Sequence, residues 1–241
     1  IILPVKDHTN VQAYVQLAGI NGEEYVISFQ RGPFQNNFHL YTLAKRDFYK
    51  TISFEREGPT GVGELSPFAN FISFDSILLY TANANRFQIA DSSGSILSRI
   101  DLSEVVRGTA YPQPSFRSEI VNNELQFFVL GEENPNEKSF YKKVKAEYIL
   151  DLNSGEITNN YPTYPTYPAG IENTFDAWKV SRCLGINGEY VYSFPFDNGI
   201  YVRNNHNYKQ YVIPNELFHI AQVEHLDPTN YQAQMGVLGR R

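Results

Sequence analysis

Tyrosine and proline alternate at one place in this sequence, and those tyrosines are the residues best suited to contact a ligand. Three Tyr-Pro steps fall within residues 161–168. Proline favours extended polyproline geometry, so we expect Tyr161, Tyr164 and Tyr167 to form a semi-rigid aromatic row. Together with Tyr111, which also precedes a proline, they could stack on a sugar ring or a peptide. The alternative is that the segment packs over the edge of a sheet and keeps its hydroxyls wet.

Arginine is the second residue type with binding potential, because its guanidinium group suits bidentate capture of carboxylate or phosphate. Arg31 and Arg117 lie in or beside expected loops, as do Arg56 and Arg107. They form either a functional cluster or solvated side chains that pair with nearby acids. Those acids are Glu57, Glu64 and Glu119. Our candidate binding contacts are Tyr161, Tyr164, Tyr167, Tyr111, Arg31 and Arg117.

Paired carboxylates are the chemistry that an enzyme would need here. A hydrolase or lyase acting on a glycan uses two carboxyl groups roughly 5 to 9.5 Å apart in a shared pocket. Glu64, Glu119 and Asp197 are the acids that could supply them. No Gly-x-Ser-x-Gly nucleophile elbow is present. We therefore assign no catalytic residue, and the enzyme is the alternative interpretation.

Metal and thiol signatures are weak. His219, Glu224 and His225 are close in sequence, but their spacing matches no common zinc motif, and a solvated segment is the simpler interpretation. The single cysteine, Cys183, lies in an expected strand, where we predict a small buried hydrophobic residue and not a nucleophile. We expect no metal and no cofactor.

Four apolar strands, each turning on an Asn or Asp pair, form an internal repeat. These turns lie at residues 19–22, 73–76, 120–123 and 185–188, and such pairs tolerate the positive φ of tight hairpins. A second turn-rich link follows each one, so every unit has four strands. The units are expected near residues 11–55, 68–100, 116–159 and 178–213.

Such units in tandem predict an all-β fold, a β-propeller of four-stranded antiparallel blades. A single domain spans residues 1–241, with about four blades visible, and this could be a partial ring. Residues 218–241 are either a tail or the start of a further blade. A β-sandwich is the alternative fold. In a propeller the long loops gather on one rim, where we expect function. Lys179 and Arg182 lie on a first strand, where one must point into the channel or a neighbouring blade.

The composition of the chain limits the classes of partner that it could bind. The net charge is −6 with scattered Lys and Arg, so a nucleic-acid surface is not indicated. No apolar run approaches the roughly 20 residues that cross a bilayer. Because Ile1 is not a natural start, we expect a processed or trimmed chain.

A resemblance to a known family rests on three stretches. Residues 57–65 form a loop rich in Gly and Pro, residues 74–77 end in Asp75-Ser76-Ile77, and residues 87–94 turn on Asp91 and Gly94. In these features the chain resembles bacterial six-bladed β-propeller lipoproteins of unknown function, in an uncharacterised branch with Tyr-Pro repeats. The resemblance is sharpest over residues 57–100.

The resemblance implies an exported protein that faces the periplasm or the cell exterior. Its precursor would be tethered to the outer membrane by a lipid on an N-terminal cysteine, which this chain lacks. We predict a cell-envelope binding module that recognises a protein, peptide or glycan through one loop-rich rim. It would meet a membrane only through the lipid anchor. A purely structural repeat domain is the third interpretation.

Overall fold

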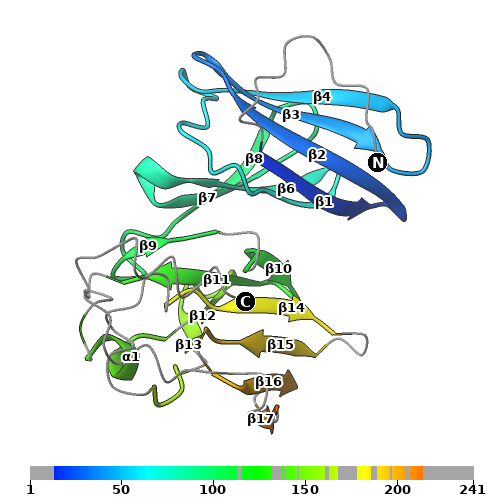
Figure 1. Cartoon of the computed structure of the whole chain (residues 1–241). Helices are drawn as coiled ribbons and strands as arrows, with labels where there is room; N and C mark the ends of the chain where they lie inside the picture. The colour runs from blue at the N-terminus through cyan, green and yellow to red at the C-terminus, as the bar shows by residue number, and fades with distance from the viewer. Residues whose placement is uncertain are drawn as a thin grey trace, which may run out of the picture. The chain divides into compact units, whose positions relative to one another are not determined.

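Short apolar strands separated by tight turns give this chain four antiparallel sheets (Figure 1). The computed structural model describes residues 14–112, 116–131, 137, 139–145, 147–160, 163–167, 178–185, 189–195, 197–204 and 207–213. Tyr161, the turn at 186–188 and the segment at 218–241 lie outside these residues. In the described part, no helix is both long enough and apolar enough to span a bilayer.

The first two sheets follow one pattern, in which neighbours in sequence are neighbours in the sheet. Sheet 1 contains β1 (Tyr14–Ile20), β2 (Glu23–Arg31), β3 (Gln35–Thr42) and β4 (Phe48–Glu55). Sheet 2 contains β5 (Asn70–Ser73), β6 (Ser76–Thr81), β7 (Arg86–Ala90) and β8 (Ile96–Asp101), with the 3-10 turn η1 (Ala82–Ala84) between β6 and β7.

The third and fourth sheets repeat this order. Sheet 3 contains β10 (Glu119–Val121), β11 (Glu124–Leu130), β12 (Glu147–Asp151) and β13 (Ile157–Asn160), and the short β9 (Thr109–Ala110) also pairs with β11. The helix α1 (Phe140–Lys143) lies between β11 and β12. Sheet 4 contains β14 (Ser181–Leu184), β15 (Tyr190–Ser193), β16 (Gly199–Asn204) and β17 (Asn207–Val212). Four-stranded antiparallel meanders in tandem are the blades of a β-propeller, which confirms the predicted fold class.

By its internal packing the chain divides into two compact units. The first unit reaches to Phe127 and includes Asp151–Glu156, so it holds sheets 1 and 2. The second unit contains Phe128–Leu150 and the chain from Ile157 onward, so it holds α1 and sheet 4.

The hairpin turns explain the registers of the sheets. Asn21 and Gly22 have φ values of 53° and 82°, and Asn122 and Asn123 have φ values of 51° and 64°. These left-handed pairs confirm the predicted turns between β1 and β2 and between β10 and β11. The predicted turn between β5 and β6 is also present, with Ser73 paired to Ser76, but none of its residues has positive φ. There the backbone N–H of Asp75 donates to Ser73 Oγ at 3.2 Å, which forms the turn by a side-chain bond instead.

The core of the first unit is a stack of aromatic and branched side chains between sheets 1 and 2. Phe29 and Phe38 on sheet 1 have ring centroids 4.9 Å apart, and Phe38 meets Phe71 of β5 edge-on at 5.5 Å. Alternation along β2 brings Ile27 and Phe29 to the same face, as the sequence pattern predicts. The intervening Val26 and Ser28 are buried too, so both faces of β2 are covered.

Acid should weaken the first unit through Asp101 at the end of β8. Ser103 donates to Asp101 Oδ1 from its hydroxyl at 2.6 Å and its backbone N–H at 3.0 Å, and Arg86 donates to Oδ2 at 3.1 Å. These bonds lower the pKa of Asp101 to about 2, while a free Asp has a pKa of about 3.9. A lowered folded-state pKa stabilises the protein above pH ~4, and the contribution is lost as pH falls towards ~2. The urea midpoint should therefore decline over this range, and less steeply in Ser103→Ala. Equal declines in the two proteins would contradict this assignment.

Candidate functional site

Tyr164 anchors the Tyr-Pro segment inside the second unit. Its side chain is only 5% exposed, and its hydroxyl donates to the backbone carbonyl of Trp178 at 2.6 Å. Its ring centroid lies 5.3 Å from that of Tyr141 on α1 and 5.4 Å from that of Phe194 at the end of β15. Tyr164 is therefore packed as the second alternative expects, because its ring contacts both α1 and the end of β15, but its hydroxyl is bonded to a carbonyl and is not in contact with water.

Tyr167 occupies a different position, since it is half-buried at the edge of the same aromatic group. Its ring meets that of Tyr141 edge-on, with centroids 5.1 Å apart. Its hydroxyl oxygen is buried and has no hydrogen-bond partner. Burial raises the pKa of Tyr167 well above its usual value, and the nearby Tyr164, Tyr141, Asp197 and Tyr201 raise it further. The Tyr167 hydroxyl is thus a neutral group near the Asp197 carboxylate and other tyrosine hydroxyls.

Asp197 completes this edge from the connection between β15 and β16. Its Oδ2 accepts hydrogen bonds from the Tyr201 hydroxyl at 2.8 Å and from the backbone N–H of Gly199 at 3.1 Å. Gln210 Nε2 donates to the Tyr201 oxygen at 3.1 Å, so the two hydrogen bonds form a chain ending on the carboxylate. Burial and then Asp197 raise the pKa of Tyr201. We call Tyr141, Tyr164, Tyr167, Asp197 and Tyr201 the tyrosine cluster.

Glycine at 199 makes this geometry possible. A Cβ at this position would lie 2.6 Å from Asp197 Oδ2 and 2.9 Å from Gln210 Nε2. It would also lie 2.9 Å from Cε2 of the Tyr201 ring, so a larger residue would displace all three side chains. Gly199 therefore serves the arrangement of Asp197 and Gln210.

A second polar cluster in the same unit is completely buried. Glu147 on β12 is 0% exposed and forms ion pairs with Arg182 of β14 and Arg203 of β16. The Tyr192 hydroxyl donates to Glu147 Oε2 at 2.7 Å. The guanidinium carbons of Arg182 and Arg203 lie 4.7 and 4.6 Å from the ring centroid of Tyr190. We call these five residues the guanidinium cluster.

Opposite charges explain how this cluster tolerates burial. Burial is the largest single influence on Arg203 and lowers its pKa, but Glu147, Tyr192 and Tyr208 together outweigh burial and keep the pKa of Arg203 above its usual value. Either Lys179 or Arg182 was expected to point into the channel or a neighbouring blade; Lys179 precedes β14, and Arg182 is the buried residue, paired with Glu147 of sheet 3. The sequence gives no local signal for Glu147 or Arg203, because the partners are 35 and 56 residues apart.

In the first unit, the predicted contact Arg31 already has an acidic partner. Its Nη1 donates to Glu64 Oε1 at 2.5 Å, and its Nη2 donates to the carbonyl of Leu65 at 3.0 Å. Arg56, from the same loop region, donates to the carbonyls of Gly32 and Pro33 at 3.1 and 3.4 Å. Arg31 therefore pairs with a nearby acid, as the second alternative expects, and Glu64 is occupied by the ion pair, whereas Arg56 is bound to backbone carbonyls.

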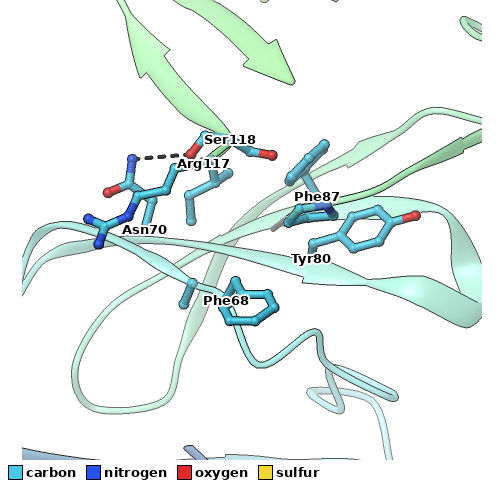
Figure 2. A pocket seen from close by; sticks show the side chains of 9 residues that line it. Phe68, Asn70, Tyr80, Phe87, Arg117 and Ser118 are labelled. Carbon is cyan, nitrogen blue, oxygen red and sulfur yellow. Dashed lines mark hydrogen bonds between the residues drawn. The ribbon is translucent and has the colours of Figure 1, made fainter. Parts of the chain in front are cut away.

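Arg117 is tied to the backbone beside a narrow cavity (Figure 2). Its Nη2 donates to the carbonyl of Leu17 at 2.7 Å, while Asn70 Nδ2 donates to the carbonyl of Ser118 at 3.2 Å. The cavity volume is about 10 Å³, which is roughly the space of one water molecule. Tyr111 is partly exposed, and Pro112 lines the cavity. A cavity of this size excludes a sugar or a peptide side chain.

Phe34 is an exposed feature that sequence reasoning missed. It is 79% exposed at the tip of the loop between β2 and β3. The loop is fixed by bonds from Gly32 N to Gln35 O at 2.8 Å and from Arg56 N to Phe34 O at 2.9 Å. A strong signal existed, since Phe34 lies between proline and polar residues within an expected rim loop.

The prediction that Cys183 is buried is wrong. It lies on β14, but its side chain is exposed and not buried. The neighbouring Arg182 alternates to the opposite face and takes the buried position beside Glu147. Among the described residues, no three His, Cys, Asp or Glu side chains gather as metal ligands, and His219, Glu224 and His225 lie outside those residues.

Comparison with solved structures gives the same fold as the strand order. A member of the DUF4221 family from Bacteroides vulgatus is similar with a TM-score of 0.66 at 16% identity, over 90% of this chain and 62% of that one. A Bacteroides fragilis protein described as exported is similar with a TM-score of 0.55 at 15% identity, over 87% of this chain and 52% of that one. The chain thus spans less than two thirds of either relative. No curated protein matches it significantly.

A family model confirms the relation to the first of these structures. The model described as "Domain of unknown function (DUF4221)" matches residues 3–224, which is most of the chain. This chain therefore belongs to the DUF4221 family.

Proposed function

We propose that this protein is a binding module that recognises a protein, peptide or glycan through the tyrosine cluster. One observation carries the proposal. Tyr167 belongs to a different segment from Asp197 and Tyr201, which are four residues apart, yet the buried Tyr164 and the Asp197–Tyr201 bond hold them at one partly exposed edge. Polar groups fixed on an aromatic base are typical of ligand sites, because little ordering remains to be done on binding.

The proposed contacts differ from those taken from the sequence. Tyr167 remains a proposed contact, and Tyr164 is now assigned as the buried ring that holds the Tyr-Pro segment in place. Arg31 is paired with Glu64, so it is a weaker candidate. Tyr111 and Arg117 remain proposed contacts of the first unit, and Tyr161 remains one outside the described residues. Asp197 and Tyr201 are added, because they are bonded to each other and both are near enough to Tyr167 to raise its pKa.

We place this activity in the cell envelope. The Bacteroides fragilis relative described as exported supports a location in the periplasm or outside the cell. The proposal includes a lipid tether and a six-bladed ring, as the sequence resemblance implies. The glycan hydrolase has no observation in its favour, since Glu64 is ion-paired and Asp197 is bonded to Tyr201 and Gly199.

Replacing Tyr167 by Ala should weaken binding to a partner recovered from envelope extract by about tenfold, as expected when an aromatic contact is lost. Affinity is measured by biolayer interferometry on immobilised protein after the partner has been identified with a panel of envelope proteins, peptides and glycans. Tyr211→Ala is the matched control, because Tyr211 lies on β17 of the same unit and is 48% exposed. Equal affinities for wild type and a folded Tyr167→Ala would exclude this edge as the binding site.

A further inference from the structure

Two clusters in the second unit share the same chemistry but differ in one component. The guanidinium cluster combines tyrosine rings, one carboxylate and two cationic groups. The tyrosine cluster combines tyrosine rings and one carboxylate. In the described residues, Asp197 forms no ion pair, and the groups that act on Tyr167 are other tyrosines and Asp197. We propose that the tyrosine cluster takes its cation from outside and binds an organic ammonium group, such as a lysine side chain or an amino sugar.

The hydrogen bonds at Asp197 hold its carboxylate in place and leave it able to accept a further hydrogen bond. Among the described residues, the hydrogen bonds to this carboxylate come from Tyr201 and from Gly199, and both end on Oδ2. Gln210 holds the Tyr201 oxygen, so the tyrosine proton remains directed at Asp197. This leaves Oδ1 to accept a bond from a ligand. A charged donor is the strongest partner for such an oxygen.

The aromatic surroundings favour an organic cation. The rings of Tyr141, Tyr164 and Tyr167 lie with centroids 5.1 to 6.5 Å apart, and Phe194 meets Tyr201 edge-on at 5.2 Å. Tyr141 and Tyr164 are buried and support the cluster, whereas Tyr167 and Tyr201 are partly open to solvent, and the face of an open ring attracts an ammonium group within about 6 Å. The Tyr167 hydroxyl is buried and without a partner, so it provides a second acceptor at this edge. The same attraction is visible in this unit where Arg203 lies 4.6 Å from the Tyr190 ring.

A metal ion fits less well than an ammonium group. Calcium takes six to eight oxygen ligands, and magnesium is usually bound by one or two carboxylates together with substrate phosphates and several waters. Asp197 is one carboxylate, and the described residues contain no group of three potential metal ligands. Exposure also separates the two clusters, because Glu147 is 0% exposed whereas Asp197 and Tyr201 are partly open to solvent.

The experiment uses N-acetyl-lysine methylamide as the ammonium probe and its Nε-acetylated counterpart as the neutral probe. Binding is followed by calorimetry and by the fluorescence of Trp178, the single tryptophan, whose carbonyl accepts the Tyr164 bond. The ammonium probe should bind saturably to wild type, and about tenfold more weakly to Asp197→Asn, which retains the shape of the side chain. Gly199→Ala should also weaken it, since the new Cβ displaces Asp197 and Gln210. Asp75→Asn, at an exposed turn of the first unit, is the control and should bind normally.

The outcomes separate this inference from the proposed function on which it rests. Equal binding of the two probes, no binding of the ammonium probe, or full binding by Asp197→Asn would each overturn the ammonium assignment. The proposed function would still hold if an envelope partner lost affinity on Tyr167→Ala. If the ammonium probe binds as expected while no envelope partner depends on Tyr167, the inference stands and the proposed function fails. Circular dichroism and the thermal midpoint of each variant confirm that a loss of binding is not a loss of fold.

Discussion

Replacing Glu147 by Gln is expected to lower the free energy of unfolding of the second unit by about 3–5 kcal/mol. The substitution keeps the size of the side chain but removes the charge that balances Arg182 and Arg203, and both arginines are buried. An unpaired buried guanidinium loses hydration without a compensating ion pair. Urea unfolding monitored by Trp178 fluorescence measures the loss, since Trp178 belongs to the second unit.

Glu64→Gln is the matched control for this result. Glu64 also pairs with an arginine, but Arg31 and Glu64 are 44% and 42% exposed, so water screens the pair. Its loss should change stability by less than about 1 kcal/mol. If Glu147→Gln costs no more than this control, the guanidinium cluster is not a stabilising element. Glu147→Leu combined with apolar replacements at Arg182 and Arg203 should recover most of the stability, because no buried charge then remains.

Replacing Tyr164 by Ala is expected to lower the free energy of unfolding by about 3–5 kcal/mol, as is typical when a buried aromatic ring is removed. The change opens a cavity among Phe140, Tyr141 and Phe194, and it leaves the Trp178 carbonyl without its donor. Tyr164→Phe separates the two effects, because it removes only the hydrogen bond and should cost about 1–2 kcal/mol. Thermal and urea unfolding of the three proteins provide the comparison.

Tyr167→Ala is the neighbouring control and should cost clearly less than Tyr164→Ala, because Tyr167 is only half-buried. Equal losses at the two positions would mean that the Tyr-Pro segment has no distinct anchor. The difference also affects how the segment is tested for binding. A variant that replaces all three tyrosines would remove the anchor with the contacts, so a loss of binding in it would not identify a ligand site.

The repeating architecture could be predicted because its signals are local. The left-handed Asn21-Gly22 and Asn122-Asn123 turns and the alternation along β2 follow from neighbouring residues alone. Strand boundaries accordingly lie within a few residues of the expected units. The turn at Phe74-Asp75 was predicted, but the sequence did not show that a hydrogen bond to the Ser73 side chain forms it.

The site could be predicted only in part, because its contacts are long-range. The Tyr-Pro segment identified Tyr164 and Tyr167, but sequence alone could not assign one ring to the interior and the other to an edge. That division depends on α1 and β15, which reach the segment only in the folded unit. For the same reason, the pairing of Glu147 with two arginines could not be predicted from the sequence, and the prediction that Cys183 is buried on β14 was wrong.

The contacts of Glu147 also bear on how the protein can be cut into pieces. Glu147 is contributed by β12 of sheet 3, whereas Arg182, Tyr192 and Arg203 are contributed by three strands of sheet 4. A polypeptide that ends after β13 would retain the acid and lose every one of these partners. A fragment that begins at β14 would carry two guanidinium groups with no counterion. Limited proteolysis within the intervening connection should therefore give products that remain associated, and each product prepared alone should be insoluble or unfolded.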